Sequence, residues 1–526
     1  MFVVCQLAFS RNRNASLFHK FITVYLKGCG LPAMAIDTMS SLGLTMSQKW
    51  AYKGIDTLAK RVNVELRHQI HDRNLLFYFS HDNVNIQFRV YEQRIDRQSH
   101  FDSGTATTIY LVPDSDGKRL DNPRLQEQRK IGRTNPITAK DIIKGPMSTA
   151  KRVVSRMRHW ILQFLLDSPD FDLEKYDGRS DARLKPPPPV HELPTGRENQ
   201  IIQHMLPTLP IDEATYNGND QVMDRAWMGL GLHSVEEMKK TGLERVVVWA
   251  GDQLTVSRLR GLANFRSHDD NSFERMAYLI PMFGWFHLQM AFATSLHTQY
   301  YGTKAAFGFS HAFDVMGKKG LSSTATQGTF HYTFEEALKE VAIARFRDLW
   351  KEVAGVKSLG ELRSRKPEEL LELAERIHRG FASTEAIVNM DNEPKEAQDQ
   401  LLRQMAQFNR DLLEYLELDL AIKVGDVGRM EDMLPRLLFR FIGGRNHKYA
   451  VEILELLQGL HREWPEDIRQ VLSWSSRSVR DNNRALTNRE YVRTKCWLVN
   501  TSGRRDGFYP VDLAQEHNVR DIKVSG

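Results

Sequence analysis

The sequence contains little of what defines several common protein classes. Its 526 residues include only three cysteines, Cys5, Cys29 and Cys496, and no Cys-x-x-Cys pair. This supports neither a zinc ribbon nor a disulfide framework, so we expect no structural zinc and a reducing compartment. No apolar run approaches the roughly 18 residues of a membrane span, and the first residues lack the order of a secretory signal. We therefore expect an intracellular protein, nuclear or cytoplasmic, that is neither secreted nor embedded in a membrane.

The excess of positive over negative charge is also small. The 72 Lys and Arg and 66 Asp and Glu give a net charge of +6, which permits an anionic partner such as nucleic acid but does not show one. Hydrophobic residues at 41% and charged residues at 26% are typical of a folded chain. The length exceeds the roughly 100–200 residues of an ordinary domain, which predicts several units or one core with large insertions.

Helical and strand patterns succeed one another along the first quarter of the chain. Residues 1–70 are predicted to be helical, and the segment around Leu42-Gly43-Leu44 resembles either a helical hairpin or a loose helix-turn-helix. Three runs within 71–112, namely "LLFYFS", "VNIQFRV" and "TATTIYLV", are apolar or alternate with period two. They predict three successive strands of an α/β core.

The rest of the chain predicts a core interrupted by insertions. The stretch "ERVVVWAGD" predicts a fourth strand, and most of the chain beyond it has helical periodicity. The predicted divisions are a charged linker containing "KPPPPV" (113–243), the fourth strand with its helix (244–262), a helical insertion (263–495), and a strand and helix that complete the core (496–526). Asp512 is expected to be an N-cap or first-turn acid of the last helix.

Two aspartates stand at predicted strands. Asp82 lies between two apolar runs in "FYFSHDNVNIQF", and Asp252 ends the fourth strand. If those strands are neighbours, their carboxylates meet, and carboxylates are the ligands of the two Mg²⁺ ions that can stabilise phosphodiester transfer. Plainer explanations remain open, because Asp252 can cap the next helix and Asp82 can lie in a hairpin turn.

His287 lies in the apolar segment "LIPMFGWFHLQM". It is interpreted either as a core histidine or as a side chain that lies next to the metal-binding acids without being a metal ligand itself. The sequence places no second histidine at the i+4 spacing of a helical zinc site.

Three stretches carry a resemblance to known proteins. The segments "VVVWAGDQLTVSRLRGL", "MFGWFHLQM" and "DLAQEHN" resemble a large fungal family of uncharacterised proteins, over roughly residues 70–524. More distantly, the order of strands with Asp, a later strand with Asp, a helical block and a final helix with Glu resembles RNase H-like transposases of cut-and-paste elements.

That distant resemblance implies a fold and a site. The fold would be an RNase H-like mixed α/β core with a large all-helical insertion, predominantly helical overall. Asp82, Asp252 and Glu516 would hold Mg²⁺ or Mn²⁺, with Asp426 as the competing third acid. Related transposases carry Cys or Asp three residues before a histidine that comes after the second acid, whereas this chain has Gly284 there.

Basic residues near these segments are candidate phosphate contacts. They are Lys151, Arg152, Arg258, Arg260, Arg266, Arg504 and Arg505. The arginines just after the fourth strand can equally form the solvated face of a helix.

These patterns leave three functions open. The first is a metal-dependent DNA transposase or nuclease derived from a mobile element. The second is a catalytically inactive nucleic-acid-binding or scaffold protein that keeps the fold. The third is a helical interaction protein without a nucleic-acid partner. The sequence decides neither the oligomeric state nor the DNA target.

Overall fold

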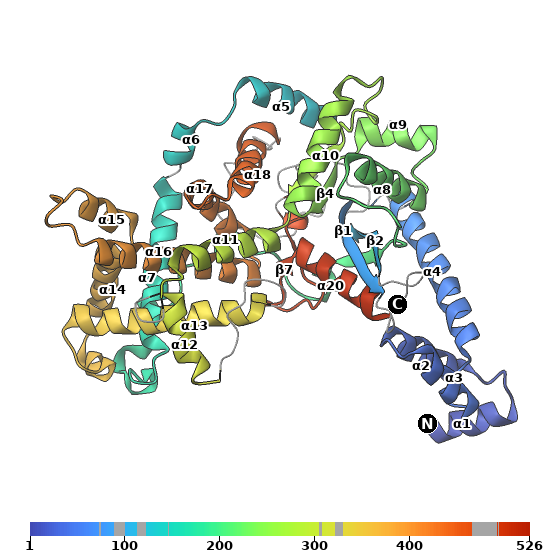
Figure 1. The fold of residues 1–526 in the computed structure, drawn as a ribbon, viewed down its shortest axis with the longest axis horizontal. Coiled ribbons are helices and arrows are strands. Elements are labelled where there is room, and N and C mark those ends of the chain that lie inside the picture. Colours follow the sequence, from blue (N-terminus) through green and yellow to red (C-terminus); the bar gives the residue numbers. More distant parts are fainter. Residues whose placement is uncertain are drawn as a thin grey trace.

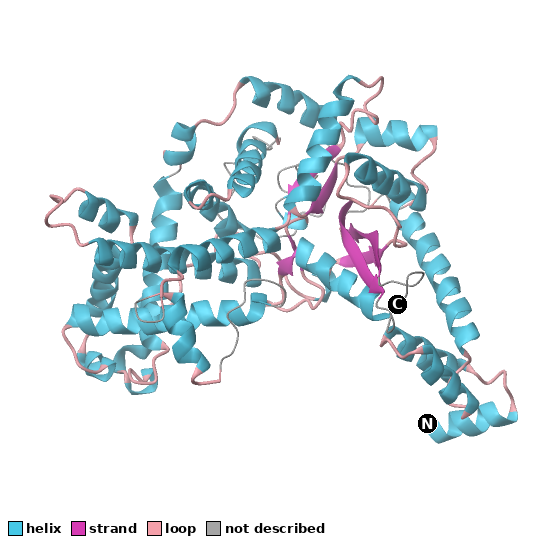
Figure 2. Cartoon of the chain, viewed as in Figure 1, coloured by secondary structure: helices cyan, strands magenta, loops and turns pink. Residues whose placement is uncertain are grey.

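The chain is predominantly helical, with one small mixed sheet (Figures 1 and 2). The structure is a computed structural model that describes residues 1–72, 75–88, 100–112, 122–145, 147–303, 308–320, 330–464, 492 and 494–525. Within these ranges, no helix has the length and apolar character needed to cross a membrane.

Within the described part of the chain, five strands form the main sheet. They are β1 (Phe77–Phe88), β2 (His100–Leu111), β3 (Ile202–Met205), β4 (Val247–Gly251) and β5 (Leu279–Phe283), in the spatial order β3-β2-β1-β4-β5. The strands β1, β2 and β3 pair antiparallel, while β4 is parallel to β1 and β5 is parallel to β4. Since Ser80 is paired with Ala250, Asp82 and Asp252 each lie two residues beyond the same pair.

Helices make up most of the remaining elements. The N-terminal ones are α1 (Phe2–Arg11), α2 (Leu17–Gly28), α3 (Ala33–Ser41) and α4 (Gln48–His71). Between β2 and β4 lie α5 (Asn122–Thr134), α6 (Ala139–Ile143), α7 (Met147–Leu166), α8 (Tyr216–Gly229) and α9 (Val235–Glu244). Next come α10 (Gln253–Phe265), α11 (Trp285–Tyr300), α12 (Phe309–Gly317), α13 (Phe330–Ala354), α14 (Pro367–Phe381), α15 (Thr384–Asp391), α16 (Gln400–Lys423), α17 (Val427–Gly443) and α18 (His447–Gln458). A two-stranded sheet of β6 (Leu498–Val499) and β7 (Tyr509–Pro510) precedes α20 (Val511–Ser525).

The strands differ from the sequence prediction in three places. The two apolar runs around Asp82 form one continuous strand, β1. The explanation of Asp82 as a hairpin-turn residue is therefore wrong. The third strand of the meander is β3, which lies inside the predicted linker. The strand β5 lies inside the predicted helical insertion, because a short apolar run that is buried carries no period that separates strand from helix.

The two faces of the sheet bury different residues, because side chains alternate along a strand. Phe79 stacks on Trp249 with ring centroids 4.3 Å apart, and both pack against Trp227 of α8. On the opposite face, Tyr78 stacks on Tyr110 at 4.8 Å. Asp82 shares this second face, because it is an even-numbered position of β1.

The last helix, α20, covers that second face. Its Gln515 Nε2 donates to the Ala106 carbonyl of β2 at 2.8 Å, and Asn518 Nδ2 donates to Thr108 Oγ1 at 3.1 Å. These bonds fix α20 on β2, although more than 400 residues separate the partners in the sequence, and α20 also packs against β1.

A charged network lies within the helical body built around α16. Glu417, 1% exposed, accepts from Arg429 Nε at 2.8 Å and from Trp160 Nε1 at 3.0 Å. The proline run at 185–190, within the predicted linker, is bound to this helical body, because Arg156 donates to the Pro188 carbonyl at 2.8 Å.

Candidate active site

The first feature of the site is the turn from β4 into α10. Asp252 caps α10, since its Oδ1 accepts from Thr255 N at 2.7 Å. A Cβ on Gly251 would stand 2.5 Å from Thr255 Cγ2, and Thr255 is buried. The Gly-Asp-Gln-Leu-Thr spacing therefore has a local cause: glycine leaves room for the threonine, and the aspartate caps the helix. The cap occupies one of the two carboxylate oxygens of Asp252.

The second feature is the turn from β5 into α11. Gly284 N donates to the Gly251 carbonyl at 2.8 Å, so β4 and β5 end side by side. Asp512 of α20 accepts from Phe286 N at 3.1 Å, from His287 N at 2.9 Å and from His287 Nδ1 at 2.9 Å. One carboxylate thus caps α11 and orients the His287 ring, because the N-terminal N–H groups of a helix have no partner within the helix.

Gly284 explains a departure from the transposase pattern. A Cβ there would come within 2.0 Å of the Asp512 carboxylate. The position three residues before His287 lacks a side chain because an acid from the last helix fills the space. The sequence predicted Asp512 in the first turn of α20 but offered no signal that it reaches α11.

Asp82 and Glu516 complete the cluster. Val84 of β1 packs with Ala106 and Val519, which places the middle of α20 over the middle of β1. Glu516 is one turn before Val519, and its Oε1 lies 3.7 Å from His287 Nε2. Glu516 therefore lies beside His287, and the charges of Asp82 and Asp252 act on the same imidazole ring.

The electrostatics of the cluster reflect this proximity. Burial raises the pKa of Asp82 well above its ordinary value, and the negative charges of Glu516 and Glu213 raise this pKa further. Burial lowers the pKa of His287, but the hydrogen bond and charge of Asp512, with the charges of Asp82 and Asp252, outweigh burial and raise it to about 9. His287 is therefore a cation at neutral pH among acids that repel one another.

A buried chain of polar groups lies directly behind Asp82. Trp249 Nε1 donates to His81 Nδ1 at 2.7 Å, so the proton of the neutral His81 ring is on Nε2, and this nitrogen lies 2.9 Å from Glu213 Oε2. All three side chains are buried. No sequence motif marks His81 or Glu213 as part of this site, and Glu213 lies in the predicted linker (113–243).

Asp426, the competing third acid, serves another purpose. It caps α17 and accepts from Val190 N at 2.9 Å and His191 N at 2.8 Å, just after the proline run. It is fully buried there. The structure brings Glu516, and not Asp426, to Asp82 and His287.

Most of the predicted phosphate-binding arginines hold parts of the chain together. Arg258 donates to the Ala214 carbonyl at 3.0 Å and lies over the Tyr216 ring. The ion pairs are Arg152 with Asp432, Arg260 with Glu452, Arg266 with Asp220, and Arg505 with Glu192. Lys151 and Arg504 are exposed. To bind the arginines of α7 and α10, a phosphate would have to displace these internal partners.

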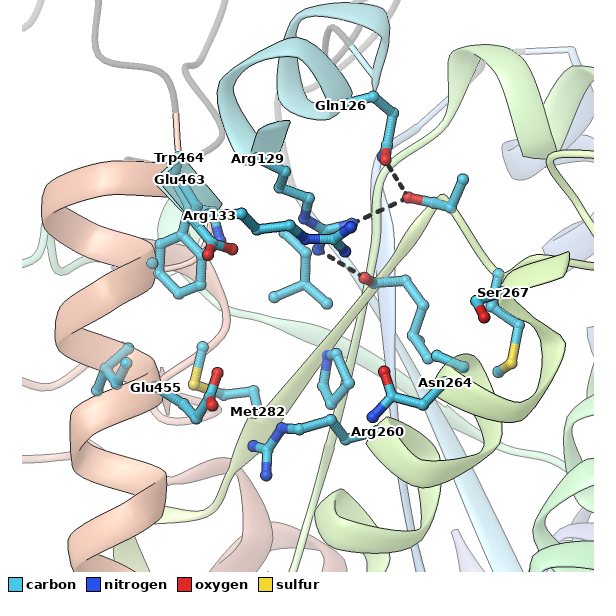
Figure 3. A pocket seen from close by; sticks show the side chains of 18 of the residues that line it. Gln126, Arg129, Arg133, Arg260, Asn264, Ser267, Met282, Glu455, Glu463 and Trp464 are labelled. Carbon is cyan, nitrogen blue, oxygen red and sulfur yellow. Dashed lines mark hydrogen bonds between the residues drawn. The ribbon is translucent and has the colours of Figure 1, made fainter. Parts of the chain in front are cut away.

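A cavity of about 820 Å³ lies at the outer edge of β5, between α5, α10 and α18 (Figure 3). Arg129 of α5 donates to the Ala277 carbonyl at 3.1 Å and the Leu279 carbonyl at 2.8 Å, and Gln126 also donates to Ala277 (Figure 3). These bonds cover the edge strand. The residues that line the cavity include Arg260 but none of the acids around His287.

The acids have the donor type of a hard cation site. Carboxylate oxygens suit Mg²⁺ and Mn²⁺. Burial, and then the negative charges of Glu516 and Glu213, raise the pKa of Asp82, and a bound cation would offset those negative charges. Among the described residues, however, no three His, Cys, Asp or Glu side chains are arranged as a group that could hold a metal ion. The residue types fit a divalent cation, while the present side-chain arrangement keeps His287 as the positive charge.

Comparison with known proteins gives one match. A family model described as a family of unknown function, DUF6589, matches residues 132–525, about three quarters of the chain. The match includes Asp252, His287 and Glu516, whereas β1 with Asp82 precedes it. No curated protein and no solved structure matches the chain.

Proposed function

The chain belongs to the family of unknown function DUF6589, and we propose that it is a transposon-derived, metal-dependent enzyme that cleaves or joins DNA phosphodiesters. One observation supports the proposal most directly. Asp82 of β1, Asp252 after β4 and Glu516 of α20 lie around one histidine, although they are 170 or more residues apart along the chain.

The order of the strands supports an RNase H-like core for this site. An antiparallel meander, β1-β2-β3, is followed by β4 parallel to β1. Asp82 in the middle of β1 and Asp252 just after β4 each lie two residues beyond the pair Ser80–Ala250. Helix α20, from the end of the chain, crosses this sheet and brings the third acid. This is the arrangement that the distant resemblance to cut-and-paste transposases implies.

Each residue has a chemical task in this proposal. Asp82, Asp252 and Glu516 would hold a divalent cation, which would neutralise the charge that develops on the attacked phosphate. His287 is kept protonated by Asp512, and its Nε2–H faces the cluster. It can donate a hydrogen bond to a phosphate oxygen or a proton to the leaving oxygen.

A second candidate function also has specific support. The protonated His287 already balances the acids, and Asp252 spends one oxygen on its helix cap. A chain that keeps this arrangement would be a catalytically inactive nucleic-acid-binding or scaffold protein.

A cleavage assay with isosteric variants separates the two functions. The purified full chain is incubated with supercoiled plasmid and with an end-labelled duplex, in Mg²⁺, in Mn²⁺ and in EDTA. Asp252→Asn removes the charge but keeps the cap, because Asn is as good an N-cap as Asp. We expect it to lower the rate at least about 100-fold, the scale of losing one transition-state charge contact. Asp506→Asn, at an exposed acid outside the cluster, is the matched control.

The outcomes are distinct. Metal-dependent cleavage that falls with Asp252→Asn and Glu516→Gln, but not with Asp506→Asn, supports the enzyme. If the parent chain neither cuts nor joins DNA with either metal, the enzyme proposal fails and the inactive protein remains. If Asp252→Asn cuts as fast as the parent, the cleavage does not depend on this cluster of acids, and the proposed site is wrong.

A further inference from the structure

Most of the net positive charge lies in the first four helices. Residues 1–72 contain nine Lys and Arg against four Asp and Glu, a net charge of +5 out of +6 for the whole chain. These helices, which we call the N-terminal arm (residues 1–72), precede the family match and project from the body (Figure 1). The end of α4 attaches them, because Arg67 donates to the Gly229 carbonyl and His71 bonds the Leu230 carbonyl.

The turn between α3 and α4 is tightly held. Gly43 adopts a φ of +75°, which ends α3 in the left-handed conformation that glycine favours. Thr45, buried in the turn, donates through Oγ1 to the Ile36 carbonyl at 3.2 Å, and Met46 N donates to Thr23 Oγ1 of α2 at 2.7 Å. The start of α4 is thereby fixed against both α2 and α3, as in a helix-turn-helix.

The first half of α4 exposes a basic face, which we call the α4 stripe. Its residues recur at intervals of three and four, so they lie on one side of the helix. The α4 stripe consists of Lys49, Tyr52, Lys53, Thr57 and Lys60, and all five are exposed. Asp56 also lies on this side, paired with Lys60 at 2.7 Å.

The chemistry of the stripe matches a phosphate backbone. Lysine ammonium groups are phosphate donors, and Tyr and Thr hydroxyls also bond phosphate oxygens. Lys27 of α2 lies over the Tyr52 ring at 5.4 Å, which adds a further cation beside the stripe. The exposed apolar side chains Leu17 and Phe21 belong to α2.

We propose that α3 and α4 form a helix-turn-helix that binds duplex DNA, with the α4 stripe directed to the major groove and its flanking phosphates. In such motifs the second helix enters the groove with its N-terminal residues at the bases while the first crosses the backbone. The inference goes beyond the proposed catalysis, since the arm would bind DNA whether or not the acids are active.

A salt titration of the full chain tests the arm. Binding of a fluorescein-labelled mixed-sequence duplex is followed by anisotropy in EDTA, so that no cleavage occurs. The variant carries Lys49→Ala, Lys53→Ala and Lys60→Ala, which helices tolerate well. If all three lysines contact phosphates, the fold-loss of affinity between about 50 and 200 mM salt should be about 40-fold smaller than in the parent, at a slope of about 0.9 per contact. The control variant carries Lys239→Ala, Lys357→Ala and Lys395→Ala, at lysines outside the arm.

Each result decides the matter. A lower affinity and a shallower salt slope for the α4 variant alone support the arm as a DNA-binding unit. Equal slopes for the two variants, or no binding by the parent at about 50 mM salt, overturn it. Binding to phosphatidylserine vesicles that needs the same lysines, without DNA binding, assigns the stripe to a membrane surface instead. Loss of cleavage with Asp252→Asn while DNA binding persists would leave this inference untouched.

Discussion

Replacing Gly284 by alanine should break the link between α20 and α11. The added Cβ would stand within 2.0 Å of the Asp512 carboxylate, so Asp512 must move. It cannot move without releasing the N–H groups of Phe286 and His287 and the His287 ring. The expected loss is therefore the loss of a helix cap and of a charge-assisted hydrogen bond together.

The magnitude is the sum of those two parts. A helix cap contributes about 1–2 kcal/mol, and a hydrogen bond to a charged group about 1.5–3 kcal/mol. The total is about 2.5–5 kcal/mol. The rise of the His287 pKa to about 9 gives a consistent scale of about 3 kcal/mol at most, because the side chain is 23% exposed.

The pH dependence has a definite sign. The folded chain holds the His287 proton up to about pH 9, while the unfolded chain releases it near pH 6.5. This stabilisation is complete below about pH 6.5 and disappears as the pH rises through about 9. The cost of Gly284→Ala should therefore be larger at about pH 7 than at about pH 10.

Hydrogen exchange measured in increasing urea gives the local free energy of unfolding. Peptides that cover 279–300 report the unit that contains β5 and α11. Asp512→Ala makes room for the new Cβ, so the double variant should cost no more than Asp512→Ala alone, with a coupling of about 3 kcal/mol. Gly380→Ala, where a Cβ meets nothing within 4 Å, is the matched control and should cost nothing. Two results would refute the proposed contact between Asp512 and the start of α11. One is that the free-energy losses of Gly284→Ala and Asp512→Ala simply add in the double variant. The other is a loss below about 1 kcal/mol for Gly284→Ala.

Two further predictions concern buried charge. Asp82→Asn should stabilise the fold by about 0.5–2 kcal/mol, more at about pH 8 than at about pH 5, because the raised pKa of Asp82 means that stability falls as that carboxyl ionises; a gain independent of pH in urea unfolding would contradict this. Glu417→Ala should cost about 3–5 kcal/mol, since it leaves Arg429 and Arg156 without their carboxylate; an unchanged urea midpoint would show that the network is dispensable.

Local patterns determined much of this protein. The fourth strand, the cap at Asp252, the first-turn acid at Asp512 and the long helices each depend on neighbours a few residues away, and the structure contains them. Such features are encoded in propensity, capping and periodicity, which act over a turn of helix or a few strand residues.

Tertiary structure decided what those elements do together. Pairing with β2 extends β1 through Asp82, where the local pattern also allowed a turn. The choice of Glu516 over Asp426, and the space that Gly284 leaves for Asp512, depend on contacts between residues far apart in the chain. Burial and packing between distant segments set these contacts, and a single sequence carries no local signal for them.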